Sequence, residues 1–245
     1  MNKFVSVSKE QKCSDQREYK FLLEQYLEHF IKKPNPFLEG PELVRAIFEA
    51  NKDVPDLAVL VVRLLSEPEI EFYVKELAAK TIFNLSCDSG NWKRLMDEEV
   101  CVHKRFAEVL VAPDSPADAR EFAAGALFNL STDEANCQKL LDARVYTLLV
   151  ALLSLDAATD KAREFAARTL CNLSFNEANA QCLLAAGVHT QLDALLRGNA
   201  TEKAKEFAAG ALKNLSMNKD TQEAFRAVGM KWAKCGDKRK RDSGC

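Results

Sequence analysis

EFAARTLCNLS, at residues 164–174, is one of four copies of the same eleven-residue pattern. The other copies are ELAAKTIFNLS at 76–86, EFAAGALFNLS at 121–131 and EFAAGALKNLS at 206–216. Their asparagines follow one another at intervals of 45, 43 and 42 residues. A period of this length is typical of chains that stack small helical units into a solenoid. The repeat therefore predicts an all-α repeat protein rather than a globular enzyme.

The spacing within each copy separates a buried face of a helix from an outward face. On a helical wheel, Leu170 and Leu173 fall on the same side as the alanine pair, and Asn172 falls on the opposite side. Stacking such helices side by side turns each outward position into a row across one surface. The outward stripes contain Leu77, Lys80 and Asn84; Phe122, Gly125 and Asn129; Phe165, Arg168 and Asn172; and Phe207, Gly210 and Asn214.

Two further helical patterns lie in each interval between copies. Apolar residues recur there at helical spacing, and Gly187 is expected to end one of these helices. The pattern predicts helices at 134–143, 145–155, 177–186 and 188–196.

A three-helix unit that closes with AAxxLxNLS resembles the armadillo repeat, and the resemblance extends over residues 41–229. It implies a right-handed α-solenoid whose third helices line a concave groove, and an activity of binding extended peptide segments there. In the importin alpha branch a tryptophan precedes each asparagine by four residues and packs on lysine side chains of the ligand. The AAGAL pattern is closer to the catenin and vacuolar-scaffold branches, because this chain has Lys80, Gly125, Arg168 and Gly210 at that position.

These patterns together define a predicted peptide-binding groove. Asparagine offers both a donor and an acceptor to a peptide backbone, although a local bond at the end of the helix would also explain its recurrence. The phenylalanines near the helix starts either contact a ligand or pack against the adjacent helix. The predicted groove residues are Lys80, Asn84, Phe122, Asn129, Phe165, Arg168, Asn172, Phe207 and Asn214.

The two ends of the chain depart from the repeat. Residues 1–14 are expected to be disordered, and 15–33 have the pattern of an amphipathic helix that caps the first unit. The repeat domain, 41–229, comprises four units and a partial fifth, whose exposed edge predicts weak self-association. Residues 230–245 are expected to be a disordered basic tail with a candidate nuclear signal at Lys238, Arg239, Lys240 and Arg241.

Composition favours a scaffold without a cofactor. The net charge of −2 combines +4 in the basic tail, counted over 231–245, with −6 in the rest, so we expect no nucleic-acid face. The eight cysteines and three histidines show no metal-ligand spacing, and no membrane span or catalytic motif occurs. We therefore expect a non-enzymatic cytoplasmic protein with a protein partner, and nuclear entry if the basic run is read as a signal. Two alternatives stay open: a nuclear-transport adaptor or cargo, and an enzyme that uses the solenoid as a frame.

Overall fold

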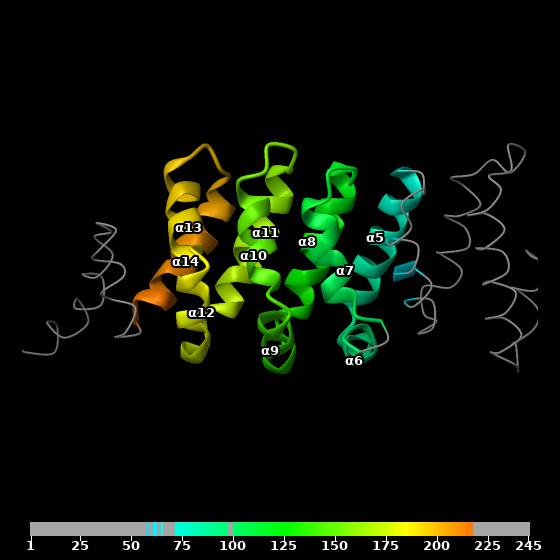
Figure 1. Ribbon diagram of the computed structural model, residues 1–245, viewed down its shortest axis with the longest axis horizontal. Coiled ribbons are helices and arrows are strands. Elements are labelled where there is room, and N and C mark those ends of the chain that lie inside the picture. The colour runs from blue at the N-terminus through cyan, green and yellow to red at the C-terminus, as the bar shows by residue number, and fades with distance from the viewer. Residues whose placement is uncertain (1–57, 59–60, 63–64, 66–71, 98–99, 218–245) are drawn as a thin grey trace, which may run out of the picture.

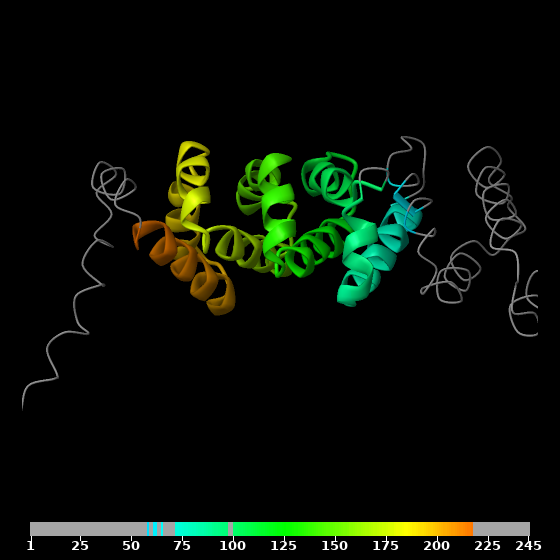
Figure 2. The ribbon, with the colours of Figure 1, turned by 90° about the horizontal axis from the view of Figure 1, so that it is seen from below.

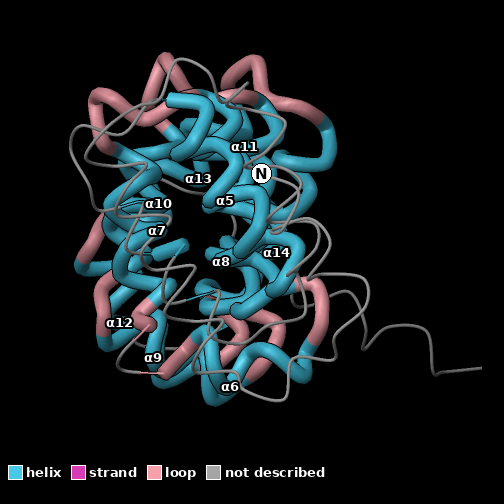
Figure 3. Tube along the Cα trace, turned by 90° about the vertical axis from the view of Figure 1, so that its right-hand side faces the viewer, coloured by secondary structure: helices cyan, strands magenta, loops and turns pink. Residues whose placement is uncertain are grey.

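The computed structural model describes residues 58, 61–62, 65, 72–97 and 100–217, and they form helices joined by short loops (Figure 1). This part of the chain contains no strand, as the repeat predicted (Figure 3). The third helices of the units are α5 (Phe72–Ser86), α8 (Ala117–Leu130), α11 (Asp160–Leu173) and α14 (Glu202–Met217).

The other two helices of each unit are shorter. The second helices are α7 (Val102–Val111), α10 (Val145–Leu153) and α13 (Val188–Arg197). The first helices are α6 (Trp92–Leu95), α9 (Glu134–Asp142) and α12 (Ala180–Ala185), with 3-10 turns η1 (Ser89–Asn91) before α6 and η2 (Glu177–Asn179) before α12.

The predicted helix bounds agree with the structure to within two residues, except that the segment predicted as a helix at 177–186 begins as a 3-10 turn. Gly187 adopts the left-handed conformation that separates α12 from α13, with φ of 72°. The corresponding residues of the preceding units, Cys101 and Arg144, are also left-handed although both carry a side chain. The sharp turn between first and second helices is therefore part of the unit and does not depend on glycine.

The third helices pack side by side in the order α5, α8, α11 and α14, and the second helices pack in the order α7, α10 and α13 (Figure 2). The predicted buried face of the third helices is confirmed in α11. The side chains of Ala166, Ala167, Leu170 and Leu173 are all fully buried. Alanine pairs at equal positions in neighbouring helices leave room for close approach of their backbones. Burial of one leucine side chain stabilises a fold by about 1.5–3 kcal/mol, so these buried faces contribute most of the stability of the stack.

A basic residue just before the glutamate of the repeat joins the third helix to the second. Arg120 Nη2 donates to the carbonyl of Ala112 at 2.8 Å, and Arg163 Nη2 donates to the carbonyl of Leu155 at 3.0 Å. Both carbonyls lie just beyond the end of a second helix, where backbone acceptors lack helical partners. These arginine side chains, which come from third helices, therefore give hydrogen-bond donors to the carbonyls at the ends of the preceding second helices.

Several predictions for the chain ends concern residues that the structure does not describe. They are the disordered segment 1–14, the capping helix at 15–33, the partial fifth unit and the basic tail, including Lys238 to Arg241. No helix of the described residues is both long enough and apolar enough to cross a membrane.

Candidate functional site

The repeated asparagines link each third helix to the one before it. We call Asn84, Asn129, Asn172 and Asn214 the outer asparagine row. The amide nitrogen of each later member donates to the serine hydroxyl at the end of the preceding third helix. The Nδ2 to Oγ distances are 3.0 Å for Asn129 to Ser86, 2.9 Å for Asn172 to Ser131 and 3.2 Å for Asn214 to Ser174.

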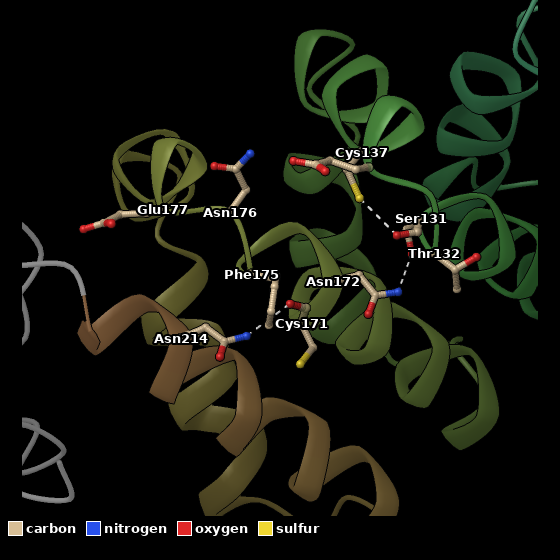
Figure 4. Close-up of a pocket in the computed structure, with 10 residues that line it drawn as sticks. Ser131, Thr132, Cys137, Cys171, Asn172, Phe175, Asn176, Glu177 and Asn214 are labelled. Carbon is tan, nitrogen blue, oxygen red and sulfur yellow. Dashed lines mark hydrogen bonds between the residues drawn. The ribbon is translucent and has the colours of Figure 1, made fainter.

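These serines fix the orientation of the amides. The Ser131 hydroxyl donates its only hydrogen to the carbonyl of Phe128 at 2.7 Å, so it can only accept from Asn172. Ser174 donates in the same way to the carbonyl of Cys171 at 2.7 Å, and therefore accepts from Asn214. The nitrogen of each amide thus faces the preceding unit, and its oxygen is the side left for other partners (Figure 4).

A second set of asparagines follows the first at a distance of seven residues. We call Asn91, Asn136 and Asn179 the inner asparagine row. Asn91 Nδ2 donates to the carbonyl of Leu85 at 3.0 Å, and Asn179 Nδ2 donates to the carbonyl of Leu173 at 2.9 Å. The sequence analysis did not single out these residues, although their fixed spacing after each outer asparagine was a readable signal.

Phenylalanine rings form a continuous row over the face of the third helices. We call Phe83, Phe122, Phe128, Phe165 and Phe207 the aromatic row. Ring centroids are 5.8 Å apart for Phe83 and Phe122, 6.2 Å for Phe83 and Phe165, and 6.0 Å for Phe128 and Phe165. All except the Phe207 ring thus stack or tilt against one another at distances typical of aromatic pairs.

Cationic side chains of the same helices lie on this row. The Arg168 guanidinium is 4.6 Å from the Phe128 centroid and 4.6 Å from the Phe207 centroid, so it fills the space between them. Lys80 Nζ is 5.9 Å from the ring of Phe122. The predicted groove residues Lys80, Phe122, Phe165, Arg168 and Phe207 therefore belong to one half-buried cluster.

Gly125 was expected on the outward stripe, and the structure places it under side chains instead. A Cβ atom at this position would lie 2.7 Å from the ring of Phe83 and 3.2 Å from the ring of Phe165. Phe83 and Phe165 come from the first and third units, and they meet over the unit between them because Gly125 has no side chain there. The sequence analysis had not included Phe83 or Phe128, which immediately precede an outer asparagine.

A pocket of about 700 Å³ lies between the third and fourth units, beyond the ends of α8 and α11 (Figure 4). Two members of the outer row, Asn172 and Asn214, contribute to its wall. Phe175, directly after α11, also lines it and has 86% of its surface exposed. The remaining lining residues are Ser131, Thr132, Glu134, Cys137, Cys171, Asn176 and Glu177.

The thiols at this pocket are protonated packing groups. Burial raises the pKa of Cys171, and burial with the nearby charges of Asp133 and Glu134 raises the pKa of Cys137 to about 11. A thiolate is the reactive form of cysteine, so both side chains are poor nucleophiles at neutral pH. The described residues contain no cluster of three or more histidine, cysteine, aspartate or glutamate side chains that could hold a metal ion.

Comparisons with known proteins identify the architecture. No family model and no curated protein matches the sequence. A computationally designed armadillo repeat protein for modular peptide recognition aligns with a TM-score of 0.64 and 21% identity, over 93% of this chain and 89% of that chain. A designed armadillo repeat protein in complex with the peptide (KR)4 gives 0.62 and 21%, over 92% and 87%. The fold is an armadillo-type α-solenoid. At this identity the likeness establishes the fold alone.

Proposed function

We propose that this protein is a non-enzymatic scaffold that binds an extended segment of a partner protein across the third helices. The outer asparagine row is the observation that carries the proposal. Each anchored amide keeps its oxygen for another partner, although the nitrogens of Asn129 and Asn214 also donate to Cys87 Sγ and to the carbonyl of Cys171, each at 3.5 Å. A peptide unit offers one donor to such an oxygen. Three such amides in neighbouring units suit a ligand that runs along the stack.

The aromatic row supports the same use of this face. Its rings are half-buried rather than sealed into the core, so a ligand laid over them would remove further apolar surface from water. Armadillo solenoids usually carry no active site, and the designed protein in complex with (KR)4 is an example of the fold with a peptide bound.

A displayed library of linear octapeptides tests the proposal. Enriched peptides should bind the wild type, and the double substitution Asn129→Ala and Asn172→Ala should weaken their binding about tenfold, as expected for two lost hydrogen bonds. Asn179→Ala is the matched control, because it removes the same amide from the inner row and should leave affinity per folded molecule unchanged. Failure to enrich any linear peptide would sink the proposal, and so would equal affinity of the double variant and the wild type.

A further inference from the structure

The residue four positions before an outer asparagine lies between groups of both neighbouring units. Over Gly125, the ring of Phe83 from the unit before meets the ring of Phe165 from the unit after. The guanidinium of Arg168, at the same position one unit later, is 4.6 Å from a ring centroid on either side. In the second and third units the protein's own side chains therefore fill this place.

Gly210 holds the same position in the fourth unit, and no described ring covers it. A Cβ atom there would lie 3.2 Å from Cys171 Sγ, and apart from its two chain neighbours no other described side chain would come within 4 Å. Cys171 precedes its outer asparagine by one residue, as Phe83 and Phe128 do in the first two units. Gly125 is buried, whereas Gly210 is only half-buried. The place that two rings fill in the second unit is thus only partly filled in the fourth.

The groups around this glycine carry no net charge. Within one helical turn on the same face of α14 lie the half-buried ring of Phe207 and the exposed side chains of Glu206 and Lys213. The charges of Glu206 and Lys213 are opposite. Arg168, which lies on the Phe207 ring, has a carboxylate of its own in Glu164 at 3.8 Å. These surroundings favour a neutral side chain over a charged one.

Among neutral side chains an aromatic ring suits this place best. The Cys171 sulfur and the Phe207 ring are both groups that make favourable contacts with a further ring. A lysine ammonium is attracted to the face of a ring, and Lys213 is placed to provide one. The chain already uses this contact, since Lys161 Nζ lies 4.8 Å from the ring centroid of Phe165.

We infer that an aromatic side chain of the partner segment lies over Gly210, in contact with Cys171 and Phe207. The inference deepens the proposed function and rests on it, because Asn172 and Asn214 would hold the backbone of that segment. The position continues the ring packing that joins α5, α8 and α11. The partner would supply the ring at the point where this chain has a thiol.

Three synthetic octapeptides test the inference. They share a neutral sequence of alanine, serine and glycine, and their one central residue is phenylalanine, cyclohexylalanine or alanine. Cyclohexylalanine keeps the size of the ring and lacks its π electrons. NMR follows binding from the side-chain amide signals of Asn172 and Asn214. It follows the placement of the ring from the α-proton signals of Gly210, which the ring current of phenylalanine shifts and cyclohexylalanine has no ring current to shift.

The phenylalanine peptide should bind about tenfold more tightly than the alanine peptide and about threefold more tightly than the cyclohexylalanine peptide. Lys213→Met removes the charge and keeps the apolar stem, so the threefold difference should vanish. Cys171→Phe places a ring of the protein at this position, as in the first two units, so the three peptides should bind alike. Cys182→Phe, the same substitution at an exposed site on α12, is the control and should leave the preference unchanged.

Equal binding of the three peptides to the wild type would overturn the inference and leave the proposed function standing. The same holds if the phenylalanine peptide shifts the signals of Asn172 and Asn214 but not those of Gly210. A nuclear Overhauser contact in the free protein between Gly210 and an aromatic ring of residues 218–245 would also overturn it, because the chain itself would then fill the position. If no peptide shifts the two asparagine signals, both the inference and the proposed function are wrong.

Discussion

The two asparagine rows place the same side chain in opposite environments only seven residues apart. Asn179 is buried, and its amide donates to the carbonyl of Leu173 at the end of α11, six residues earlier in the chain. Asn172 is half-buried, and its amide donates to a serine of the preceding unit while its oxygen faces away. Asn91 and Asn179 of the inner row bond to the end of the third helix just before them in the chain, and the outer row joins neighbouring third helices. The same residue type can therefore serve two structural roles, and its hydrogen-bond partners show which one.

The strongest test of this comparison is Asn179→Ala. Loss of the amide leaves the carbonyl of Leu173 buried without its donor, so the free energy of unfolding should fall by about 2 kcal/mol. Asn172→Ala should cost less than about 1 kcal/mol, because the Ser131 hydroxyl keeps its bond to Phe128. Midpoints of urea denaturation measure both. Equal losses for the two variants would make the outer row as structural as the inner one and remove the contrast.

Acid should weaken the fold without acting on the outer asparagine row. Burial, and next the charges of Lys104 and Lys139, lower the pKa of His103 from 6.5 to about 4. The unfolded chain therefore takes up a proton more readily than the folded chain, and stability is lost as pH falls from about 6.5 towards 4. Between pH 7.5 and 5.5 the free energy of unfolding should fall by about 1 kcal/mol from this residue.

His103→Tyr is the control for that pH effect, because Tyr146 occupies the equivalent position in α10 and is also buried. The variant should show a smaller loss of stability over the same pH range in thermal denaturation. His189, at the equivalent position in α13, has its pKa lowered by burial and should account for part of what remains. An unchanged pH dependence in the His103→Tyr variant would contradict the assignment.

The smallest expected effect concerns the orientation of one amide. Ser131→Ala removes the hydroxyl that accepts from Asn172, so the amide becomes free to rotate and peptide binding should weaken about threefold. Stability should change by less than about 1 kcal/mol. Titration with an octapeptide enriched from the displayed library measures the affinity, and Ser154→Ala is the control, because Ser154 bonds to Gln191 between two second helices. Unchanged affinity would mean that the serine does not orient the asparagine.

Periodicity was sufficient to predict the helices and their buried faces, because the spacing of leucine and alanine along a helix indicates which side of it is buried. It predicted helix bounds such as 188–196, which the structure extends by one residue. It could not predict that Phe83 meets Phe165 over Gly125, because that contact joins first and third units across an intervening one. Nor could it show that Arg168 fills the space between two rings. A helical wheel gives the direction of each side chain around one helix, but it does not give the contacts made with other helices.

The asparagines show the same limit at the level of single atoms. The sequence analysis left open whether they bind a ligand or make a local bond at the helix end. The structure gives the amide nitrogen a bond to the previous unit and leaves the oxygen outward, so each amide has one use inside the protein. Whether the oxygen contacts a partner remains the proposal that the octapeptides test.

The bond from each outer asparagine to the serine one unit earlier also bears on how such a chain can change length. Removal of residues 132–174, a span of 43, would join Ser131 to Phe175 and bring Asn214 opposite the Ser131 hydroxyl, as Asn172 is now. Duplication of the same span would insert one further amide in register. Loss or gain of a whole period thus yields a shorter or longer outer asparagine row, whereas a deletion of half a period would set first helices against third helices and abolish the stack.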